Sequence, residues 1–498
     1  MARCIMVQGT MSGAGKSLIA AALCRIFWQD GWRVAPFKSQ NMALNSYITR
    51  DGLEMGRAQV VQAEAAGCEP DVRMNPILLK PSSDTGSQLI VCGEVRGQYT
   101  ASEYFRMKKT LVPEILAAYR SLAQENDIIV IEGAGSPAEI NLREGDIVNM
   151  GFAELVNAPV ILVGDIDRGG VFAQLYGTVA LLEESERKRI VGTVVNKFRG
   201  DTELLRPGLS VLEEKTGAPV LGIVPYAQVD LDDEDSLSPR LLQMQAVRLV
   251  DIAVIRLPRI SNFTDFSPLE SHPALGVRYV ERADQLGTPD LVIVPGTKST
   301  MEDLRWMRQS GMEMAVHKLA AAGIPVLGVC GGYQMLGASL EDPEHVEGGG
   351  IMAGMGLLPC TTVFEHEKVR TRVGASILTQ PFAGARLDAY EIHMGRTQRR
   401  GAAPFCRLED GREEGAVLGN VFGTYLHGLF DTGELTQRLA NWLLERKGLQ
   451  KEKLHVMSHA EYKEKQYDLL ADTVRRALDI PALYRAMDAF ASGKESES

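Results

Sequence analysis

Residues 5–17 read IMVQGTMSGAGKS, which is an apolar run, a glycine-rich turn and then Lys16-Ser17 at the start of a helical stretch. A loop of this kind turns its backbone N–H groups inward and forms an anion cradle at a helix N-terminus. Lys16 is then expected to reach the β- and γ-phosphates of a nucleotide, and the Ser17 hydroxyl to hold Mg²⁺. The stretch therefore predicts a strand, a phosphate loop and a helix at the start of an α/β sheet.

The glycine spacing departs from the common phosphate-loop pattern G-x-x-x-x-G-K-[ST]. Position 10 is Thr, and the first glycine, Gly9, stands six residues before Gly15. The strand–loop–helix context is still the required one, so we expect the loop to bind ATP. The alternative is a glycine turn followed by a surface lysine. The expected ATP-binding residues of the loop are Gly9, Thr10, Gly13, Gly15, Lys16 and Ser17.

Two further polar residues follow predicted strands of the same sheet. Glu132 follows the apolar run 127–131, and a carboxylate at the carboxyl end of a parallel strand faces the ligand crevice. We expect Glu132 to share the metal with Ser17, the alternative being an ordinary turn acid. Asn196 follows the run 192–195 and is expected to contact the adenine ring of ATP, although a strand-end turn residue would look the same.

The rest of the chain repeats this alternation of short apolar strands and helical stretches. Continuous apolar runs are typical of parallel strands that are buried on both faces. Helical patterns lie between them, for example at 16–28 and 114–125, and this order predicts doubly wound parallel sheets. The predicted strands are 4–7, 34–37, 127–131, 159–163, 192–195 and 221–224, then 249–255, 291–295, 325–329 and a group around 417–425.

A chain of 498 residues is too long for one ordinary core and predicts two or three domains. The acidic run DLDDEDSLSP at 230–239 interrupts the alternation and is interpreted as a solvated linker. From Leu435 the pattern is helical and charged, and it ends in a polar tail at 493–498 that we expect to be frayed. The predicted divisions are an ATP-dependent domain at 1–230, a linker at 231–248, a second α/β domain at 249–434 and a helical extension at 435–498.

Composition excludes several classes of function. A net charge of −11 argues against a strongly basic nucleic-acid binder. The longest apolar stretches are far shorter than a membrane span, and no signal peptide is recognisable. The seven cysteines form no C-x-x-C pair or His/Cys cluster, which predicts reduced thiols in a cytoplasmic protein and no protein-bound transition metal.

One cysteine differs from the other six. Residues 324–337 read IPVLGVCGGYQMLG, so an apolar strand ends at Cys330 and two glycines lead into a helix. This pattern predicts a nucleophile elbow, in which the helix N-terminus favours the thiolate and the N–H of Gly331 is a candidate oxyanion donor. The alternative is a buried apolar cysteine, which is the reading that we keep for the other six.

A cysteine nucleophile needs a base, and the chain has eight histidines. His427 ends a strand and is followed by Gly428, which would place its imidazole at the same sheet edge as Cys330 if both strands belong to one parallel sheet. His366 and His393 stay open as alternatives. The remaining five are interpreted as surface residues of charged helices or loops: His272, His317, His345, His455 and His459.

The second half resembles a class I-type glutamine amidotransferase domain, which has a flavodoxin-like fold. The likeness covers about residues 249–434 and rests on G-x-C-x-G-x-Q at 328–334 and on PGTKS at 295–299, a loop that implies an oxyanion donor at Gly296. The usual His-x-Glu is absent because Leu429 stands where the Glu would be. The segment HGLF at 427–430 resembles the cobyrinate-type branch, which also lacks that Glu, and Glu391 is a weak candidate for the missing acid.

The first half resembles dethiobiotin synthetase-like ATPases, whose phosphate loop has the same spacing. Segments at 37–45, 54–59, 75–81 and 132–142 narrow the likeness to corrin-amidating enzymes of the cobyrinate-type family. Their polar side chains suit a corrin rim that bears carboxylates and amides, although helix capping and surface polarity would also explain them. The tentative corrin-contacting residues are Gln40, Asn41, Asn45, Arg57 and Gln59.

The resemblance implies an ATP- and glutamine-dependent amidation. The substrate would be adenosylcobyrinic acid a,c-diamide, whose b, d, e and g carboxylates become amides to give adenosylcobyric acid, with ATP and Mg²⁺ activating each carboxylate and Cys330 and His427 releasing ammonia from L-glutamine. Two alternatives stay open: cobyrinic acid a,c-diamide synthase or another amidotransferase of the same architecture, and a MinD- or ParA-like switch ATPase. The switch ATPase would not explain Cys330 and His427.

Overall fold

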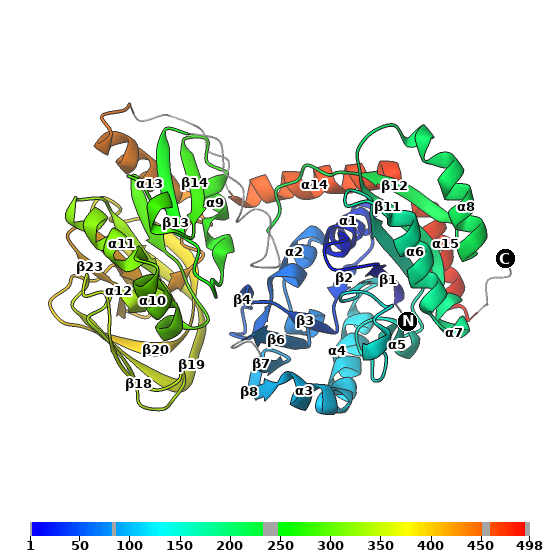
Figure 1. Cartoon of the computed structure of the whole chain (residues 1–498), viewed down its shortest axis with the longest axis horizontal. Helices are drawn as coiled ribbons and strands as arrows, with labels where there is room; N and C mark the ends of the chain where they lie inside the picture. The colour runs from blue at the N-terminus through cyan, green and yellow to red at the C-terminus, as the bar shows by residue number, and fades with distance from the viewer. Residues whose placement is uncertain (1, 82–85, 233–247, 451–458, 494–498) are drawn as a thin grey trace. The chain divides into compact units, whose positions relative to one another are not determined.

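The structure is a computed structural model that describes residues 2–81, 86–232, 248–450 and 459–493. The chain divides into two compact units, each built from stretches that are separated in sequence (Figure 1). Unit 1 is formed by residues 1–42, 54–231 and 463–498, and unit 2 by residues 43–53 and 232–462.

Unit 1 is organised around a six-stranded parallel sheet in the order β12-β11-β10-β1-β9-β2. Its strands are apolar because both faces are covered, and residues 128–131 of β9 are all fully buried. The six predicted strands of the first half are confirmed. They are β1 (Arg3–Gly9), β2 (Val34–Phe37), β9 (Ile128–Glu132), β10 (Val160–Asp165), β11 (Ile190–Phe198) and β12 (Val220–Pro225).

The register of this sheet sets the position of the phosphate loop. Val7 pairs with Glu132, Gly9 pairs with Val163, and Asp165 pairs with Asn196, so the polar residues gather at the carboxyl edge. The helices of unit 1 are α1 (Lys16–Gln29), α2 (Arg57–Ala65), α3 (Ala101–Met107), α4 (Val112–Glu125), α5 (Met150–Leu155), α6 (Val171–Leu181), α7 (Glu184–Arg187), α8 (Arg206–Thr216), α14 (His459–Ala477) and α15 (Ile480–Ala491).

The last two helices complete the core of unit 1. Tyr467, Leu470 and Leu483 are buried in the same apolar cluster as Ile5 and Phe27. The packing of α14 on β12 is tight, since a Cβ at residue 222 would lie 1.9 Å from the carbonyl oxygen of residue 477. The carboxyl-terminal helices are therefore part of the amino-terminal fold.

A second, smaller sheet of unit 1 was not predicted. It has the order β3-β6-β7-β8, with β3 parallel to β6 and the other pairs antiparallel. Its strands are β3 (Gln40–Met42), β6 (Ile77–Pro81), β7 (Gly86–Val91) and β8 (Glu94–Thr100), and the chain between β3 and β6 also forms β4 (Ser46–Ile48) and β5 (Glu54–Gly56).

Unit 2 is organised around another six-stranded sheet, in the order β14-β13-β15-β16-β24-β23. All its pairs are parallel except β23 with β24, which confirms a second doubly wound domain. The strands are β13 (Val250–Ile255), β14 (Leu275–Val280), β15 (Leu291–Val294), β16 (Val326–Val329), β23 (Ala416–Leu418) and β24 (Val421–Thr424). The helices are α9 (Ser267–Glu270), α10 (Thr300–Gln309), α11 (Met312–Ala321), α12 (Gly331–Leu336) and α13 (Glu434–Arg446).

Unit 2 also has a largely antiparallel sheet that was not predicted. Two long strands dominate it, β19 (Cys360–Ile377) and β20 (Arg386–Arg399), which pair antiparallel. The short strand β25 (Leu426–His427) pairs with β20, and this pairing brings residue 427 to the sheet. The other members are β17 (Ser339–Asp342), β18 (Gly350–Ala353), β21 (Cys406–Leu408) and β22 (Glu413–Glu414).

The structure tests the predicted domain organisation only in part. Most of the predicted linker and the end of the polar tail fall on residues 233–247 and 494–498, which lie outside the described residues. The range of the predicted helical extension contains α13, which belongs to unit 2, and α14 and α15, which lie mainly in unit 1. The four linear divisions of the chain stay a prediction.

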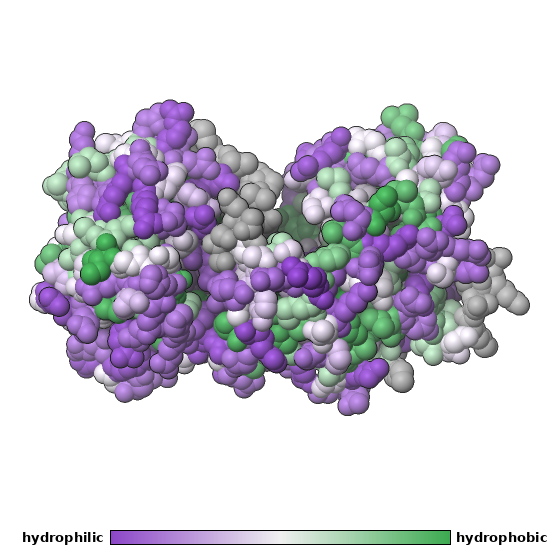
Figure 2. Space-filling model, turned by 60° about the horizontal axis from the view of Figure 1, so that its bottom comes forward, coloured by the Kyte–Doolittle hydropathy of each residue, from purple (hydrophilic) through white to green (hydrophobic). Residues whose placement is uncertain are grey.

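On the face that Figure 2 shows, hydrophilic residues predominate among the described residues, and apolar residues lie between them. Single exposed apolar residues such as Leu204 and Ile351 are ordinary in folded proteins. Among the residues that the structure describes, none of the helices has the length and hydropathy needed to span a bilayer.

Candidate active sites

The loop between β1 and α1 has the backbone that a phosphate cradle needs. Gly13 and Gly15 have φ angles of 76° and 97°, in the left-handed region that favours glycine. A Cβ at Gly9 would lie 2.9 Å from Cγ of Lys16, so this position also requires glycine. The 14-residue helix α1 begins directly after the loop and presents its N-terminus to it. This geometry fits the predicted nucleotide site.

Lys16 and Thr10 are both held by the chain around the loop. The Lys16 ammonium donates to the carbonyl oxygens of Met11 and Gly135, each at 3.1 Å. The Thr10 hydroxyl donates to Oε1 of Gln174 at 3.1 Å. A lysine that spans the loop in this way is positioned for the phosphates that the loop would hold.

Three polar side chains surround the carboxylate of Glu132, which is 1% exposed. The Ser17 hydroxyl donates to Oε1 at 2.8 Å, the Lys38 ammonium lies 3.1 Å from the same oxygen, and Gln62 donates to Oε2 at 2.6 Å. Hydroxyl and carboxylate oxygens are the ligands that Mg²⁺ prefers, so Ser17 and Glu132 fit the predicted metal. Lys38 supplies the positive charge that a buried carboxylate requires.

Asn196 lies against the phosphate loop. Its amide donates to the carbonyl oxygen of Ala14 at 2.9 Å, and a Cβ at Gly15 would lie 2.1 Å from that amide nitrogen. The next residue, Lys197, donates to the carbonyl oxygen of Gly13 at 2.6 Å and pairs with Asp165 at 2.8 Å. The strand end at Asn196 therefore braces the loop, and the contact with adenine stays a prediction.

The five tentative corrin-contacting residues are divided between the two units. Gln40 and Asn41 lie on β3, and Arg57 and Gln59 lie on α2, all in unit 1, whereas Asn45 lies in the segment 43–53 of unit 2. Asn41 donates to Gln59 at 3.3 Å, and Gln40 accepts the hydroxyl of Tyr104 at 2.6 Å. These bonds fit the structural reading of the residues as well as the functional one.

Cys330 has the strained backbone of a nucleophile elbow. It stands between β16 and α12 with φ of 51° and ψ of −108°, a conformation that residues with a side chain rarely adopt. A Cβ at Gly332 would lie 1.9 Å from the carbonyl oxygen of Val294, and a Cβ at Gly328 would collide with the backbone of α12. The thiol donates to the carbonyl oxygen of Ile392 at 3.5 Å.

The PGTKS loop lies beside this elbow. A Cβ at Gly331 would lie 2.7 Å from Cγ2 and 3.1 Å from the backbone nitrogen of Thr297. A Cβ at Gly296 would lie 3.4 Å from Cε1 of His427. The two predicted oxyanion donors, Gly296 and Gly331, are therefore on backbone that borders the nucleophile and the imidazole.

His427 is buried between Cys330 and an acid that the sequence did not reveal. Its Nδ1 lies 2.6 Å from Oδ2 of Asp265, and the other oxygen of that carboxylate accepts the N–H of Gly428 at 3.1 Å. Burial alone would lower the pKa of His427, but the Asp265 carboxylate and a hydrogen bond with Cys330 raise it to about 10. His427 is therefore suited to hold the proton that a cysteine nucleophile releases.

The suggestion that Glu391 replaces the missing acid is wrong. Its carboxylate accepts from Arg412 at 3.1 Å and lies 3.7 Å from Nε2 of His393. Nδ1 of His427 already bonds to Asp265, which lies on the 3₁₀ turn Phe263–Phe266. The orienting acid therefore comes from a different part of the sheet edge.

The other histidines are largely where the sequence placed them, with one correction. His345 is exposed and His317 and His459 are half-buried, whereas His272 is 1% exposed and accepts the N–H of residue 274 at 3.2 Å. The interpretation of His272 as a surface residue is wrong, because the side chain is buried and its Nδ1 accepts a backbone N–H. His455 lies outside the described residues.

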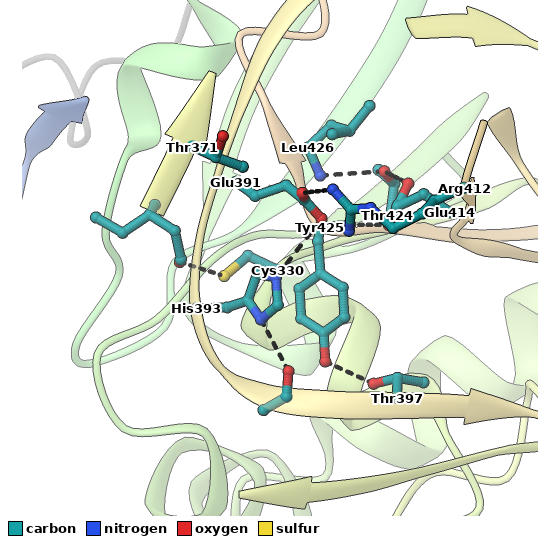
Figure 3. Close-up of polar contacts among 12 residues, drawn as sticks. Cys330, Thr371, Glu391, His393, Thr397, Arg412, Glu414, Thr424, Tyr425 and Leu426 are labelled. Carbon is teal, nitrogen blue, oxygen red and sulfur yellow. Dashed lines mark hydrogen bonds and ion pairs between the residues drawn. The ribbon is translucent and has the colours of Figure 1, made fainter. Parts of the chain in front are cut away.

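A network of polar residues on β20 and the strands beside it lies near the elbow (Figure 3). The ring of His393 stacks on Tyr425 with 3.7 Å between centroids, and Tyr425 and Thr397 share a hydrogen bond of 2.5 Å. Gln334 donates to the Tyr425 hydroxyl at 3.2 Å. Burial raises the pKa of Glu414, next to this network, to about 7. Among the described residues no group of three metal-ligating side chains is found, here or elsewhere.

Sequence reasoning missed three residues of these sites. Lys38 directly follows β2, and the rule that found Glu132 at the end of its strand would have found it as well. Neither Asp265 nor Tyr390 belongs to a local sequence pattern that indicates a site. The ring of Tyr390 stacks on His427 with 5.2 Å between centroids. Their roles depend on contacts between residues that are far apart in the chain.

Two family models match the chain. The CobQ/CobB/MinD/ParA nucleotide binding domain matches residues 5–237, and the CobB/CobQ-like glutamine amidotransferase domain matches residues 251–435. Full-length relatives give the finer assignment. The curated cobyric acid synthase of Ruminiclostridium cellulolyticum is 57% identical over 98% of this chain and 98% of its own length. The chain belongs to the cobyric acid synthase family.

Other members of the cobyric acid synthase family are similar over the same extent. The cobyric acid synthase of Lachnoclostridium phytofermentans is 53% identical over 98% of this chain and 99% of its own length, and that of Clostridium acetobutylicum is 51% identical over 97% and 98%. Membership makes the chain a glutamine-hydrolysing amidoligase with a nucleotide-binding domain. The alternative of a switch ATPase is set aside, because the amidotransferase domain accompanies the nucleotide-binding one.

Proposed function

We propose that the chain amidates the b, d, e and g carboxylates of adenosylcobyrinic acid a,c-diamide to give adenosylcobyric acid, with one ATP and one glutamine for each amide. The corrin substrate is inferred from the printed names of the full-length relatives. The observation that carries the chemistry is the pairing of an elbow cysteine, Cys330, with His427 and Asp265 in one unit and a phosphate loop in the other.

The glutaminase reaction follows from the geometry of unit 2. The Cys330 sulfur attacks the side-chain amide carbon of glutamine, and His427 passes the thiol proton to the leaving ammonia. Asp265 holds Nδ1 of His427, so that Nε2 is the nitrogen that handles the proton. The backbone N–H groups at Gly296 and Gly331 are the proposed donors to the oxyanion. Water then hydrolyses the glutamyl thioester.

The phosphate loop of unit 1 and the residues around Glu132 support the proposed synthetase reaction. A carboxylate does not react with ammonia at neutral pH, and its phosphorylation by ATP provides a leaving group. The loop N–H groups and Lys16 stabilise the charge of the transferred phosphoryl group. Ser17 and Glu132 would hold Mg²⁺, which when bound neutralises phosphate charge, and the Lys38 ammonium pairs with the Glu132 carboxylate. Ammonia from the glutaminase reaction then displaces phosphate from the acyl phosphate.

The test is mass spectrometry of adenosylcobyrinic acid a,c-diamide after incubation with the protein, ATP, Mg²⁺ and either glutamine or an ammonium salt. We expect up to four successive carboxyl-to-amide steps with either nitrogen source. Cys330→Ala should abolish the steps with glutamine and keep those with ammonium, and Cys68→Ala, outside the proposed site, is the matched control. An unchanged corrin in the presence of active glutaminase and ATPase would refute the corrin assignment, and amidation of cobyrinic acid at a and c instead would favour the diamide synthase.

A further inference from the structure

Segment 43–53 interrupts unit 1 in sequence but packs within unit 2. It is preceded by β3 and followed by β5, both of unit 1. Glu54 at its far end is fully buried and pairs with Lys80 at 2.8 Å. The eleven residues between belong to the glutaminase unit, although they precede its main stretch by about 180 positions.

The first contact of this segment is with the turn that carries Asp265. Asn262 begins that turn with φ of 51°, and its carbonyl oxygen accepts the N–H of Asp265 at 3.0 Å. The side-chain amide of Asn262 donates to the carbonyl oxygen of Ser46 at 3.4 Å and to the hydroxyl of Tyr390 at 2.9 Å. Asn262 is 3% exposed, so these bonds lie out of water. One amide thus connects the segment, Tyr390 and the turn of the orienting acid.

The second contact is with the ring that covers His427. Tyr390 stacks on the imidazole with 5.2 Å between centroids and an interplanar angle of 19°. Ile48, which is fully buried, forms an apolar cluster with Tyr390 and Ile392, and the carbonyl oxygen of Ile392 accepts the Cys330 thiol. The segment therefore packs on the neighbours of both proposed catalytic residues.

The segment is fixed on its outer side as well. The guanidinium of Arg372 donates to the Tyr47 hydroxyl at 2.6 Å, and the Tyr47 ring lies 6.0 Å from that of Tyr390. The backbone at Gly52 approaches the carbonyl oxygen of Arg370, which a Cβ would meet at 3.3 Å. The segment therefore contacts β19 through Tyr47 and Gly52, and β20 through Ile48.

We propose that segment 43–53 is a positioning element of the glutaminase, which fixes the His427 imidazole through Asn262 and Tyr390. This inference rests on the proposed roles of Cys330 and His427. Its residues act by holding Tyr390, which covers the face of the imidazole, and the turn that carries its Nδ1 partner. Small displacements of a general base lower the rate of proton transfer without removing the substrate site. The amino-terminal part of the chain thereby sets the rate of a reaction in the carboxyl-terminal half.

The test uses the full-length protein and compares Ile48→Ala, Asn262→Gly and Tyr390→Phe. Glycine accepts the positive φ of Asn262, so this variant removes only the side-chain bonds, and Tyr390→Phe removes only a hydroxyl. We expect each variant to lower kcat for glutamine hydrolysis by about tenfold, to change KM for glutamine by less than about twofold and to shift the pH profile of kcat. Amidation with ammonium should be unchanged, and Ile351→Ala, which truncates an exposed isoleucine of unit 2, is the control.

The outcomes separate this proposal from the proposed function. Unchanged kcat in Asn262→Gly and Tyr390→Phe would overturn it, and so would a rise in KM alone. An equal loss of ammonium-driven amidation would also overturn it, since that loss would place the effect in unit 1 or in folding. If Ile48→Ala does not fold, the other two variants decide. Retained glutamine-driven amidation in Cys330→Ala would instead refute the glutaminase assignment itself.

Discussion

Asp265 holds the imidazole of His427 through a bond of 2.6 Å to Nδ1, although the two residues stand 162 positions apart. The carboxylate is buried, and its second oxygen accepts the N–H of Gly428. A carboxylate that accepts from both the ring and the adjacent backbone fixes the ring orientation and the proton position together. In the proposed glutaminase reaction, Asp265 would take the place of the Glu of the usual His-x-Glu motif.

Replacement of Asp265 tests this role. We expect Asp265→Asn to lower kcat for glutamine hydrolysis by about 10²-fold, because the amide cannot stabilise the imidazolium and favours the wrong tautomer. The pKa of His427 should fall, so the loss of its protonated form should occur at lower pH than in the parent protein. Kinetics of glutamine hydrolysis between pH 6 and pH 10 would measure both effects. Asp284→Asn, at an exposed ion pair of the same unit, should leave the profile unchanged.

The elbow should not tolerate a larger residue after the nucleophile. In Gly332→Ala the new Cβ would lie 1.9 Å from the carbonyl oxygen of Val294, which is backbone and cannot rotate away. We expect a loss of about 3 kcal/mol in the stability of unit 2, together with loss of glutaminase activity. Gly177→Ala, in the interior of α6, meets no atom within 4 Å and should instead stabilise unit 1 by about 0.5–1 kcal/mol. Thermal unfolding of both variants provides the comparison.

Breaking the buried ion pair of Lys80 and Glu54 should lower the free energy of unfolding more than replacing both residues with apolar ones. The two side chains are 6% and 0% exposed. Lys80→Met removes a cation that pairs with the buried Glu54 carboxylate, for which we expect a loss of about 3–5 kcal/mol. The double variant Lys80→Met with Glu54→Leu should recover part of this loss, because the carboxylate that lost this cation is then no longer buried as a charge. Equal destabilisation of the single and double variants, measured by denaturant unfolding, would contradict this account.

Asp303 makes the stability of unit 2 depend on pH. Its carboxylate accepts the Thr297 hydroxyl at 2.5 Å and the N–H of Arg259 at 3.2 Å, and burial raises its pKa to about 6. Because the folded-state pKa lies above the unfolded value, its contribution is fully present below about pH 4 and is lost as the pH rises through about 6.

We therefore expect the parent protein to lose stability relative to Asp303→Asn between pH 4 and pH 7, by an amount on the order of 3 kcal/mol. Melting temperatures of the two proteins, measured across this range, would show the difference. A constant difference in melting temperature over the whole range would mean that the Asp303 carboxyl group does not titrate in this interval.

The two parallel sheets were predictable because their strands are buried on both faces and read as continuous apolar runs. The antiparallel sheets were not, since β19 carries EHEK in its middle and most of its residues are only half-buried. A sheet with one solvated face gives a weak alternating pattern, and the charges break it.

Some residues of the candidate sites could likewise be predicted from the sequence, and others could not. Cys330 and the phosphate loop were predictable, because each needs glycines within a few residues to allow a strained backbone. Lys38 was within reach of the same strand-end argument. Asp265 was not, since its motif SNFTDFSP resembles an ordinary turn and only the folded sheet brings it to His427. Residues that only the tertiary structure brings together have no characteristic spacing in the sequence.

The interleaved make-up of the two units has a consequence for synthesis on the ribosome. Segment 43–53 is made early, but the remainder of its unit begins only at residue 232, about 180 residues later. Tyr390 and Ile392, which bury Ile48, are made about 340 residues after it, so at about 5–20 residues per second Ile48 waits about 17–70 s for them. The core of unit 1 waits longer still, because α14 and α15 leave the ribosome last. Neither unit can finish folding co-translationally before the other is almost complete, so nascent chains should expose apolar surface until release.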